Sequence, residues 1–404
     1  MLNQKKTINL YLIKPNKMKT LFYCVLLAFT TSIFSQTKKD SIASKIMNET
    51  RTYSVFVPAN YEKNKGKKYP LLFLLDGDYL FDPVVGALKY GNYWDDLPEV
   101  IVVGLHQNTN NERDTDCEIG DNGLPAFKGI KFFDFINNEL LPTIEKEFRV
   151  APLRIIAGHD LTATFANLFV LQNVPIFNGY IVLSPELNDL MLERIPTVLN
   201  EFKKPAFYYQ ATADGDLKYT KQAMKQLAES LSTVTSTNVF AKTDEFQNAS
   251  HYSLVLHAIP NALYHIFSAY KPISTAEYNE KIVLLEKDHV LYLKQKYDLI
   301  KRDYGIDMKI RYSDFKAIEA AIIKNNDLNA FDDLAQLARK NYPKSMLADY
   351  FLAQLFENKS EDSKAMKYYL TAYQQDEIGD LSKTMMMEKA EKLKSKIATN
   401  KKGK

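Results

Sequence analysis

LRIIAGHDLTATFANLF, residues 153–169, has the pattern of a buried strand, a sharp turn and a helix. The apolar run up to Gly158 predicts the strand, and GHDLT, residues 158–162, predicts the turn. The small and apolar residues after Thr162 predict the helix. A side chain at the middle of such a turn projects above the end of a sheet, so Asp160 is the first candidate functional residue.

Strands and helices alternate on both sides of this stretch, from Thr52 to about Phe267. The continuous apolar runs YPLLFLLDG (69–77) and EVIVVGLH (99–106) are typical of strands buried on both faces of a parallel sheet. TYSVFVP (52–58) alternates between apolar and polar residues and is the one strand that we expect to be antiparallel. The pattern predicts an α/β fold with a doubly wound, mostly parallel sheet.

The composition changes after Lys271, where glycine and strand-like alternation almost disappear. Residues 275–305 predict one connecting helix that ends at Gly305. Residues 306–400 predict an all-helical domain, and residues 345–377 fit a helix-turn-helix repeat of the tetratricopeptide type. A plain helical bundle would explain the same pattern. In a repeat, the packing positions would be Leu352, Ala353, Phe356, Ala365, Tyr369 and Ala372.

The first 35 residues predict a signal peptide. From Met18 a lysine is followed by an apolar run and then by small polar residues up to Ser35 and Gln36, and the run is shorter than a membrane span. An uncleaved membrane anchor is the alternative. We expect an exported protein, periplasmic or secreted, with no stable membrane span and an α/β domain over residues 36–270.

Composition excludes several classes of site. The chain is 46% hydrophobic and 25% charged with a formal net charge of +3, and it has no nucleic-acid-binding motif, so we expect no nucleic-acid partner. Beyond the predicted signal peptide, Cys117 is the only cysteine. A single cysteine cannot form an intramolecular disulfide, and it leaves too few ligands for a Cys/His zinc site.

Six segments between residues 50 and 270 follow one another in the order and spacing of a known family. They are VFVPANYEKNKGKKYPLLFLLDGD (55–78), IVVGLHQNTNNERDTD (101–116), FFDFINNELLPTIEKEFRV (132–150), RIIAGHDL (154–161), FNGYIVLSPEL (177–187) and QNASHYSLVLHAIPNAL (247–263). In these segments the chain resembles the esterase family of α/β-hydrolases, which includes esterase D and enterochelin esterase. That family hydrolyses carboxylic esters without a metal or cofactor, so the resemblance implies a small ester or ester-like ligand.

The resemblance also implies a nucleophile, an acid and a histidine, in that chain order. The family's GHSLGG is GHDLTA in this chain, so Asp160 stands where the family has its serine. His251, at the start of the last helix of the α/β part, matches the family's histidine. Asp214 or Asp216, after the strand PAFYYQATA, would be the acid, and we favour Asp214 because it follows the strand sooner.

The oxyanion donors that the resemblance implies are the backbone N–H of Leu161 and one near Asp78. Thr162 and Ala163 replace glycines whose small size lets the helix approach the strand closely. Because of these two replacements, we expect that Asp160→Ser alone does not restore strong esterase activity.

Two hypotheses follow from Asp160. A carboxylate attacking an ester forms an anhydride, a poor intermediate, although aspartate nucleophiles serve haloalkane dehalogenases and epoxide hydrolases. Those enzymes need a lid, and no insertion of that size lies between Ser184 and Asp214. Ser184 and Ser250 lie near the site but not on a turn of the nucleophile type. The chain is therefore either an esterase with an altered nucleophile or a non-catalytic binding protein whose C-terminal helices recruit a protein partner. In the second case, a charged His251 would lie between Asp160 and the triad acid.

Overall fold

The computed structural model describes residues 36–108 and 112–402. The predicted signal peptide lies outside these residues. The expected strands all form, and they join a sheet in the order β1-β2-β4-β3-β5-β6-β7-β8. The strands are β1 (Thr37–Ser44), β2 (Glu49–Phe56), β3 (Tyr69–Leu74), β4 (Ile101–Leu105), β5 (Val150–His159), β6 (Gly179–Leu183), β7 (Ala206–Ala213) and β8 (Val239–Phe246).

The sheet is mixed. Strand β2 pairs antiparallel with β1 and with β4, whereas β3 to β8 all pair in parallel. The antiparallel prediction for the alternating strand is therefore confirmed. Strand β1 was not expected, because its mostly exposed residues show no apolar alternation and it forms only by adding to the edge of β2.

Helices cover both faces of the sheet. The face that contains Leu72 packs against α2 (Gly77–Tyr93) and α9 (Leu254–Ile266). The face that contains Phe73 packs against the other helices of the α/β part except the short α3 (Glu112–Asp116). These are α4 (Lys128–Phe135), the π-helical turn η2 (Ile136–Leu140), α5 (Leu141–Glu147), α6 (Leu161–Asn167), α7 (Asp189–Asn200) and α8 (Lys218–Leu231). Burial on both faces explains the continuous apolar runs in the sequence.

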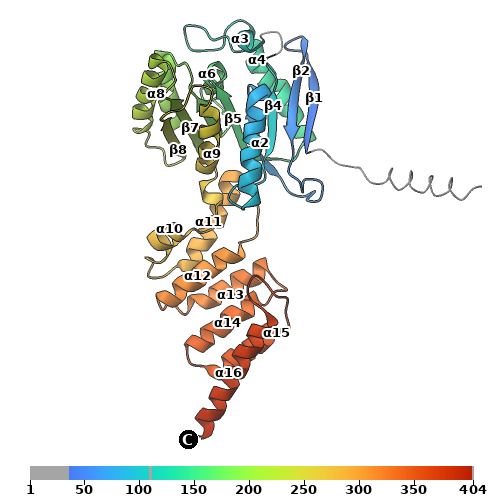
Figure 1. The fold of residues 1–404 in the computed structure, drawn as a ribbon, viewed down its shortest axis with the longest axis vertical. Helices are drawn as coiled ribbons and strands as arrows, with labels where there is room; N and C mark the ends of the chain where they lie inside the picture. Colours follow the sequence, from blue (N-terminus) through green and yellow to red (C-terminus); the bar gives the residue numbers. More distant parts are fainter. Residues whose placement is uncertain (1–35, 109–111, 403–404) are drawn as a thin grey trace, which may run out of the picture.

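From Ser268 on, every named element of the described residues is a helix, and this part stacks below the sheet in Figure 1. It begins with the short helical segments η3 (Ser268–Tyr270), α10 (Thr275–Glu277) and η4 (Tyr278–Ile282). The longer helices are α11 (His289–Tyr304), α12 (Tyr312–Lys324), α13 (Ala330–Asn341), α14 (Leu347–Asn358), α15 (Asp362–Tyr373) and α16 (Lys383–Lys402). No helix of the described residues is long and apolar enough to cross a membrane.

The single connecting helix expected over 275–305 is interrupted. Helical structure stops after Ile282 and resumes at His289, preceded by Asp288 in the left-handed conformation. The second piece ends at Gly305, as predicted, with φ 67°. A Cβ at Gly305 would lie 2.4 Å from the ring of Pro152 at the start of β5, so glycine lets α11 end against the sheet.

The all-helical part is joined to the α/β part through a shared core and one arginine. Tyr304 packs against Phe207 of β7 and Phe267 after α9. Arg311 forms an ion pair with Asp95 after α2, and its Nη1 donates to the carbonyl of Tyr270 at 2.8 Å. The hydrophobic cluster on the face of the sheet that contains Leu72 therefore continues into the C-terminal helices.

Helices α14 and α15 form the expected helix-turn-helix. Of its predicted packing positions, Ala353, Ala365, Tyr369 and Ala372 are fully buried, whereas Phe356 is half-buried. Whether these helices form a tetratricopeptide repeat stays a prediction.

Candidate active site at the carboxyl edge of the sheet

The turn between β5 and α6 has the strained backbone that a nucleophile requires. Asp160 has φ 60° and ψ −122°, a conformation that costs a non-glycine residue about 1–3 kcal/mol. Its N–H donates to the carbonyl of Leu183 at 2.8 Å. A Cβ on Gly158 would lie 2.5 Å from the backbone of Thr162, so glycine at 158 is what lets strand and helix approach each other. Asp160 is therefore presented above the sheet, as the sequence predicted.

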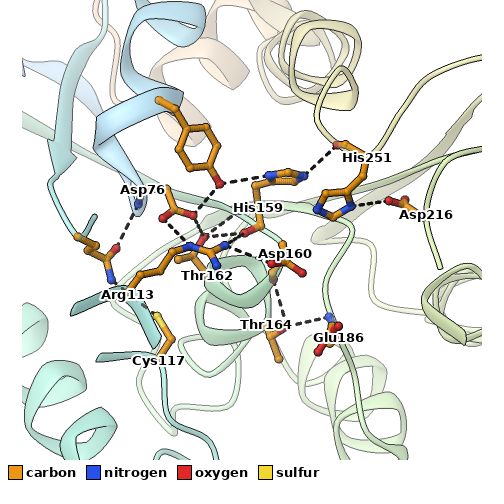
Figure 2. Close-up of polar contacts among 12 residues, drawn as sticks. Asp76, Arg113, Cys117, His159, Asp160, Thr162, Thr164, Glu186, Asp216 and His251 are labelled. Carbon is orange, nitrogen blue, oxygen red and sulfur yellow. Dashed lines mark hydrogen bonds and ion pairs between the residues drawn. The ribbon is translucent and has the colours of Figure 1, made fainter. Parts of the chain in front are cut away.

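Thr162 does not disturb this turn. Its hydroxyl accepts the N–H of His159 at 2.9 Å and donates to Oδ2 of the buried Asp76 at 2.7 Å. Strand and helix approach closely although Thr162 replaces the family's glycine, because Gly158 provides the close approach and the threonine side chain turns toward Asp76. Figure 2 shows Thr162 beneath the turn, between Asp76 and His159.

Asp76, directly after β3, connects the groups below the turn. Its carboxylate accepts hydrogen bonds from Thr162, from the Tyr79 hydroxyl at 2.8 Å and from Arg113 Nε at 2.8 Å. Burial, and after it the charge of Asp76, raises the pKa of Tyr79, so the hydroxyl stays protonated and donates. Sequence reasoning assigned no role to Asp76 or Arg113, although both lie in segments that carry the family resemblance.

Arg113 joins this buried cluster to the candidate nucleophile. Its Nη2 donates to the carbonyl of His159 at 2.9 Å and lies 3.4 Å from Oδ2 of Asp160. No other ion pair to Asp160 exists in the described residues, and its Oδ1 accepts no hydrogen bond within them. The Asp160 side chain is 33% exposed, so Arg113 offsets its charge while one oxygen remains open to a ligand.

His251 has a carboxylate partner, but not the one that we favoured. Its Nδ1 lies 2.6 Å from Oδ1 of Asp216 (Figure 2). The Asp214 carboxylate instead accepts the N–H of Asn248 at 2.8 Å and is exposed. The preference for Asp214 was wrong because the turn after β7 directs residue 214 toward the loop after β8 and residue 216 back into the sheet.

Asp216 is fixed on its other side as well. Its Oδ2 accepts the Ser184 hydroxyl at 2.5 Å and the N–H of Ala213 at 2.7 Å. Ser184 is buried and its hydroxyl is committed to this bond, so it orients Asp216 and is not exposed as a nucleophile. Ser250 bonds Ser253 within its own turn. The result is a chain of hydrogen bonds from Ser184 through Asp216 to His251.

The rings of His159 and His251 lie against each other, with centroids 4.4 Å apart. Burial, and after it the charge of His251, lowers the pKa of His159 to about 4, so His159 is neutral near pH 7. Its Nε2 therefore donates to the carbonyl of His251 at 3.1 Å. In the described residues the Nε2 of His251 has no hydrogen-bond partner, which leaves it available to a bound molecule. His251 lies against one carboxylate, Asp216, and not between two, because Asp160 is turned to Arg113.

The two expected oxyanion donors open helices at the same edge. Leu161 is the first residue of α6 and Asp78 lies in the first turn of α2, and N–H groups there have no acceptor within their own helix. Strands β3 and β5, which lead into these helices, are neighbours in the sheet. No group of three or more His, Cys, Asp or Glu side chains in residues 36–108 and 112–402 is arranged to hold a metal ion.

Tyrosines and a second carboxylate surround Asp160 and His251. Thr164 Oγ1 donates to the carbonyl of Asp160 at 3.2 Å and accepts the N–H of Glu186 at 2.8 Å, so Glu186 lies beside the turn. The Tyr219 hydroxyl donates to Glu186, which raises the pKa of Tyr219. Tyr252, 82% exposed, meets the His251 ring edge-on with centroids 5.2 Å apart.

Comparisons with known proteins show the family of the α/β part. The family model described as "Putative esterase" matches residues 44–256. Ferri-bacillibactin esterase BesA of Bacillus subtilis (strain 168) is 24% identical over 245 residues, which are 54% of this chain and 85% of that protein.

Among solved structures, an uncharacterised protein from Capnocytophaga ochracea DSM 7271 is similar over 89% of this chain and 100% of its own, with a TM-score of 0.79 and 26% identity. Its coverage includes the C-terminal helices as well as the sheet. An IroE-like serine hydrolase from Shewanella oneidensis is similar over 78% of this chain and 98% of its own, with a TM-score of 0.56 and 19% identity. At that identity, the second likeness shows the fold alone.

Proposed function

Because this chain belongs to the esterase family of α/β-hydrolases, we propose that the site at Asp160 hydrolyses a carboxylic ester with water as the direct nucleophile. The observation that carries the proposal is the chain of hydrogen bonds from Ser184 through Asp216 to His251, with the Nε2 of His251 left open. A histidine oriented in this way is the general base of the family's fold.

Asp160 is not the nucleophile in this proposal. Attack by its carboxylate on an ester would give an anhydride. The ion pair with Arg113 also makes the carboxylate a weaker nucleophile. The acyl-enzyme of a serine esterase is therefore replaced by a single displacement. Asp160 lies where it can accept a hydrogen bond from the attacking water or from the ligand.

The proposed step uses only side chains and backbone of this chain. The Nε2 of His251 removes a proton from water as the water oxygen bonds to the ester carbonyl carbon. The carbonyl oxygen becomes an oxyanion that the N–H groups of Leu161 and Asp78 stabilise. The bond to the alcohol oxygen then breaks, His251 returns the proton to that oxygen, and an acid and an alcohol leave. No metal or cofactor is needed.

One observation favours a second candidate function, binding without turnover. A negative charge on Asp160 beside the proposed oxyanion donors opposes the charge that develops during ester attack. Arg113 only partly offsets this charge, because its shortest bonds go to Asp76 and to the carbonyl of His159. The same site would then hold an ester-like molecule intact.

Hydrolysis of a short-chain aryl ester by the chain lacking residues 1–35 separates the two candidates. Direct water attack predicts a slow rate above background that His251→Ala abolishes, with no burst of alcohol at the start because no acyl-enzyme forms. A flat result with aryl ester, epoxide and haloalkane substrates would leave the binding function.

Asp160→Ser is the informative companion variant. The turn keeps its strained backbone and Thr162 lies below it, which weakens the argument from Thr162 against a gain from this single change. We now expect the serine variant to hydrolyse the aryl ester at least tenfold faster than the parent and to show an initial burst. A serine variant no faster than the parent would mean that the oxyanion donors are misplaced, and would count against hydrolysis at this site.

We also propose that the protein is exported through the signal that begins at Met18, and that the C-terminal helices bind a protein partner. The sequence pattern is the basis for export. The exposed apolar side chains Leu299, Ile323 and Leu370 on the C-terminal helices are the basis for partner binding. Fractionation of cells that express the chain from Met18 tests export. Capture of a partner by the parent, and its loss in Ile323→Lys, tests the helices.

A further inference from the structure

Asp160 places a carboxylate where a ligand's ester carbonyl would meet the family's serine. Its Oδ1 accepts no hydrogen bond in the described residues, and its Oδ2 has only the 3.4 Å contact with Arg113. A partly exposed carboxylate whose second oxygen accepts no hydrogen bond has room for a further cationic donor beside Arg113. The missing donor is a group that the ligand can bring.

The charges around Asp160 agree with this. Asp76 and Arg113 neutralise each other below the turn, so the side that faces a ligand carries the charges of Asp160 and of the exposed Glu186. Asp216 adds a third carboxylate, which His251 contacts. The nearby lysine, Lys221, donates to the backbone carbonyl of Asp214 and not to these carboxylates. The site therefore repels an anionic ligand and attracts a cationic one.

Aromatic rings complete the surroundings of a cation. Tyr219, 54% exposed, is bonded to Glu186, and Tyr252 lies edge-on to His251. Tyr79, 38% exposed, meets His159 edge-on with centroids 6.0 Å apart. The π face of an exposed aromatic ring attracts an ammonium group, so these tyrosines favour a cationic ligand.

We propose that the site takes an ester that carries an ammonium group close to its carbonyl, as an aminoacyl ester does. The ammonium donates to the free oxygen of Asp160, and the ester carbonyl lies toward His251 and the N–H of Leu161. This assignment rests on the proposed function for the ester part of the ligand, whereas the ammonium contact depends on Asp160 alone.

The ammonium also explains how hydrolysis tolerates the aspartate. A negative charge that Arg113 only partly offsets, beside the oxyanion donors, opposes the developing oxyanion. When the ligand's ammonium binds Asp160, it cancels one negative charge at the site. The ammonium also faces the oxyanion. A serine at this position carries no charge for the ammonium to neutralise, so this part of the gain is specific to the aspartate.

The test uses matched probes with the chain lacking residues 1–35. Phenylalaninamide and N-acetylphenylalaninamide measure binding by calorimetry, and the two corresponding methyl esters measure hydrolysis, all near pH 6, where the free α-amino group is charged. We expect the ammonium probe of each pair to be preferred about tenfold by the parent. Asp160→Asn keeps the shape of the side chain and tolerates the left-handed backbone, and we expect it to reduce the preference to about twofold or less.

Asp214→Asn is the control, because it removes a carboxylate at the same edge that faces Asn248 instead of Asp160. It should retain the tenfold preference. Equal binding of the two amides by the parent, or a preference that survives Asp160→Asn, would overturn the inference. Melting curves establish that each variant is folded.

The outcomes separate the inference from the proposed function. Preferred binding of the ammonium amide with no hydrolysis of either ester supports the ammonium contact and overturns hydrolysis. Hydrolysis of both methyl esters at equal rates supports hydrolysis and overturns the ammonium contact.

Discussion

The two sides of the turn at Asp160 differ in how completely their polar groups are paired. Below the turn, Asp76 is fully buried and accepts hydrogen bonds from Thr162, Tyr79 and Arg113. Above the turn, one oxygen of Asp160 and the Nε2 of His251 have no partner in the described residues. The buried side fixes the geometry and contributes stability, while the open side carries the groups that can act on a ligand.

This division suggests how the site could change its nucleophile without losing its shape. The strained turn depends on Gly158, on the buried bonds to Asp76 and on backbone contacts with β6, and none of these involves the side chain of residue 160. A change of serine to aspartate would therefore alter the chemistry above the turn and leave the support below it intact.

The largest expected effect comes from breaking the buried side. Asp76→Asn removes the charge that faces Arg113 and weakens the bond from Thr162, so we expect the free energy of unfolding to fall by about 3–5 kcal/mol. Denaturant unfolding measures it. Asp82→Asn, on the exposed face of α2, the helix that begins directly after Asp76, should change the free energy of unfolding by less than about 0.5 kcal/mol. Equal losses of unfolding free energy in Asp76→Asn and Asp82→Asn would contradict a stabilising role for the buried side of the turn.

A pH titration of stability tests the buried His159. Its pKa is lowered to about 4 in the folded state and is near 6.5 in the unfolded chain, so the unfolded state binds more protons between these values. This contribution is fully present above pH 6.5 and is lost as the pH falls toward 4, by about 3 kcal/mol. Unfolding at pH 7.5 and pH 4 should show that loss in the parent and lack it in His159→Gln. A parallel pH dependence in both proteins would mean that His159 titrates normally.

Activity should distinguish the two aspartates after β7. Asp216→Asn removes the acceptor that orients the His251 ring, and we expect kcat/KM for an ester to fall roughly 100-fold, which corresponds to about 2.7 kcal/mol. Asp214→Asn should change kcat/KM by no more than about twofold. If Asp214→Asn caused the larger loss, the pairing seen in the structure would not be the one used in solution.

The smallest effect concerns Thr162. Thr162→Gly restores the family's residue but removes the hydroxyl between His159 and Asp76, and we expect a loss of about 2 kcal/mol in unfolding free energy. Thr371→Gly, on the exposed face of α15, loses helix propensity and a solvent-exposed hydrogen bond to the carbonyl of Lys367, together about 0.5 kcal/mol. A stabilised Thr162→Gly would show that the threonine is tolerated under strain.

Much of the architecture could be predicted from local patterns. Strands β3 and β4 appear in the sequence as continuous apolar runs because both of their faces are buried, and β2 appears as an alternating one. Strand β1 and the break before His289 could not be predicted in this way. The first forms through pairing with an edge, and the second interrupts a segment whose residues otherwise suit a helix.

The candidate site was predictable only in part. Asp160 and His251 could be identified from the sequence because each lies in a short segment whose own pattern predicts the structural element that carries it. Asp76 and Arg113 belong to segments that carried the family resemblance, but nothing local indicated that they meet. Thr162 and Asp76 are bonded although 86 positions apart, and only the sheet brings them together.

The sequence by itself determined the α/β fold, the turn that presents Asp160 and the helix start that presents His251, because each depends on the local order of apolar, glycine and polar residues. The tertiary structure decided that Asp216 and not Asp214 contacts His251, and that Arg113 and not His251 pairs with Asp160. Those choices depend on the direction of single side chains from loops. That direction is set by packing against residues distant in the chain.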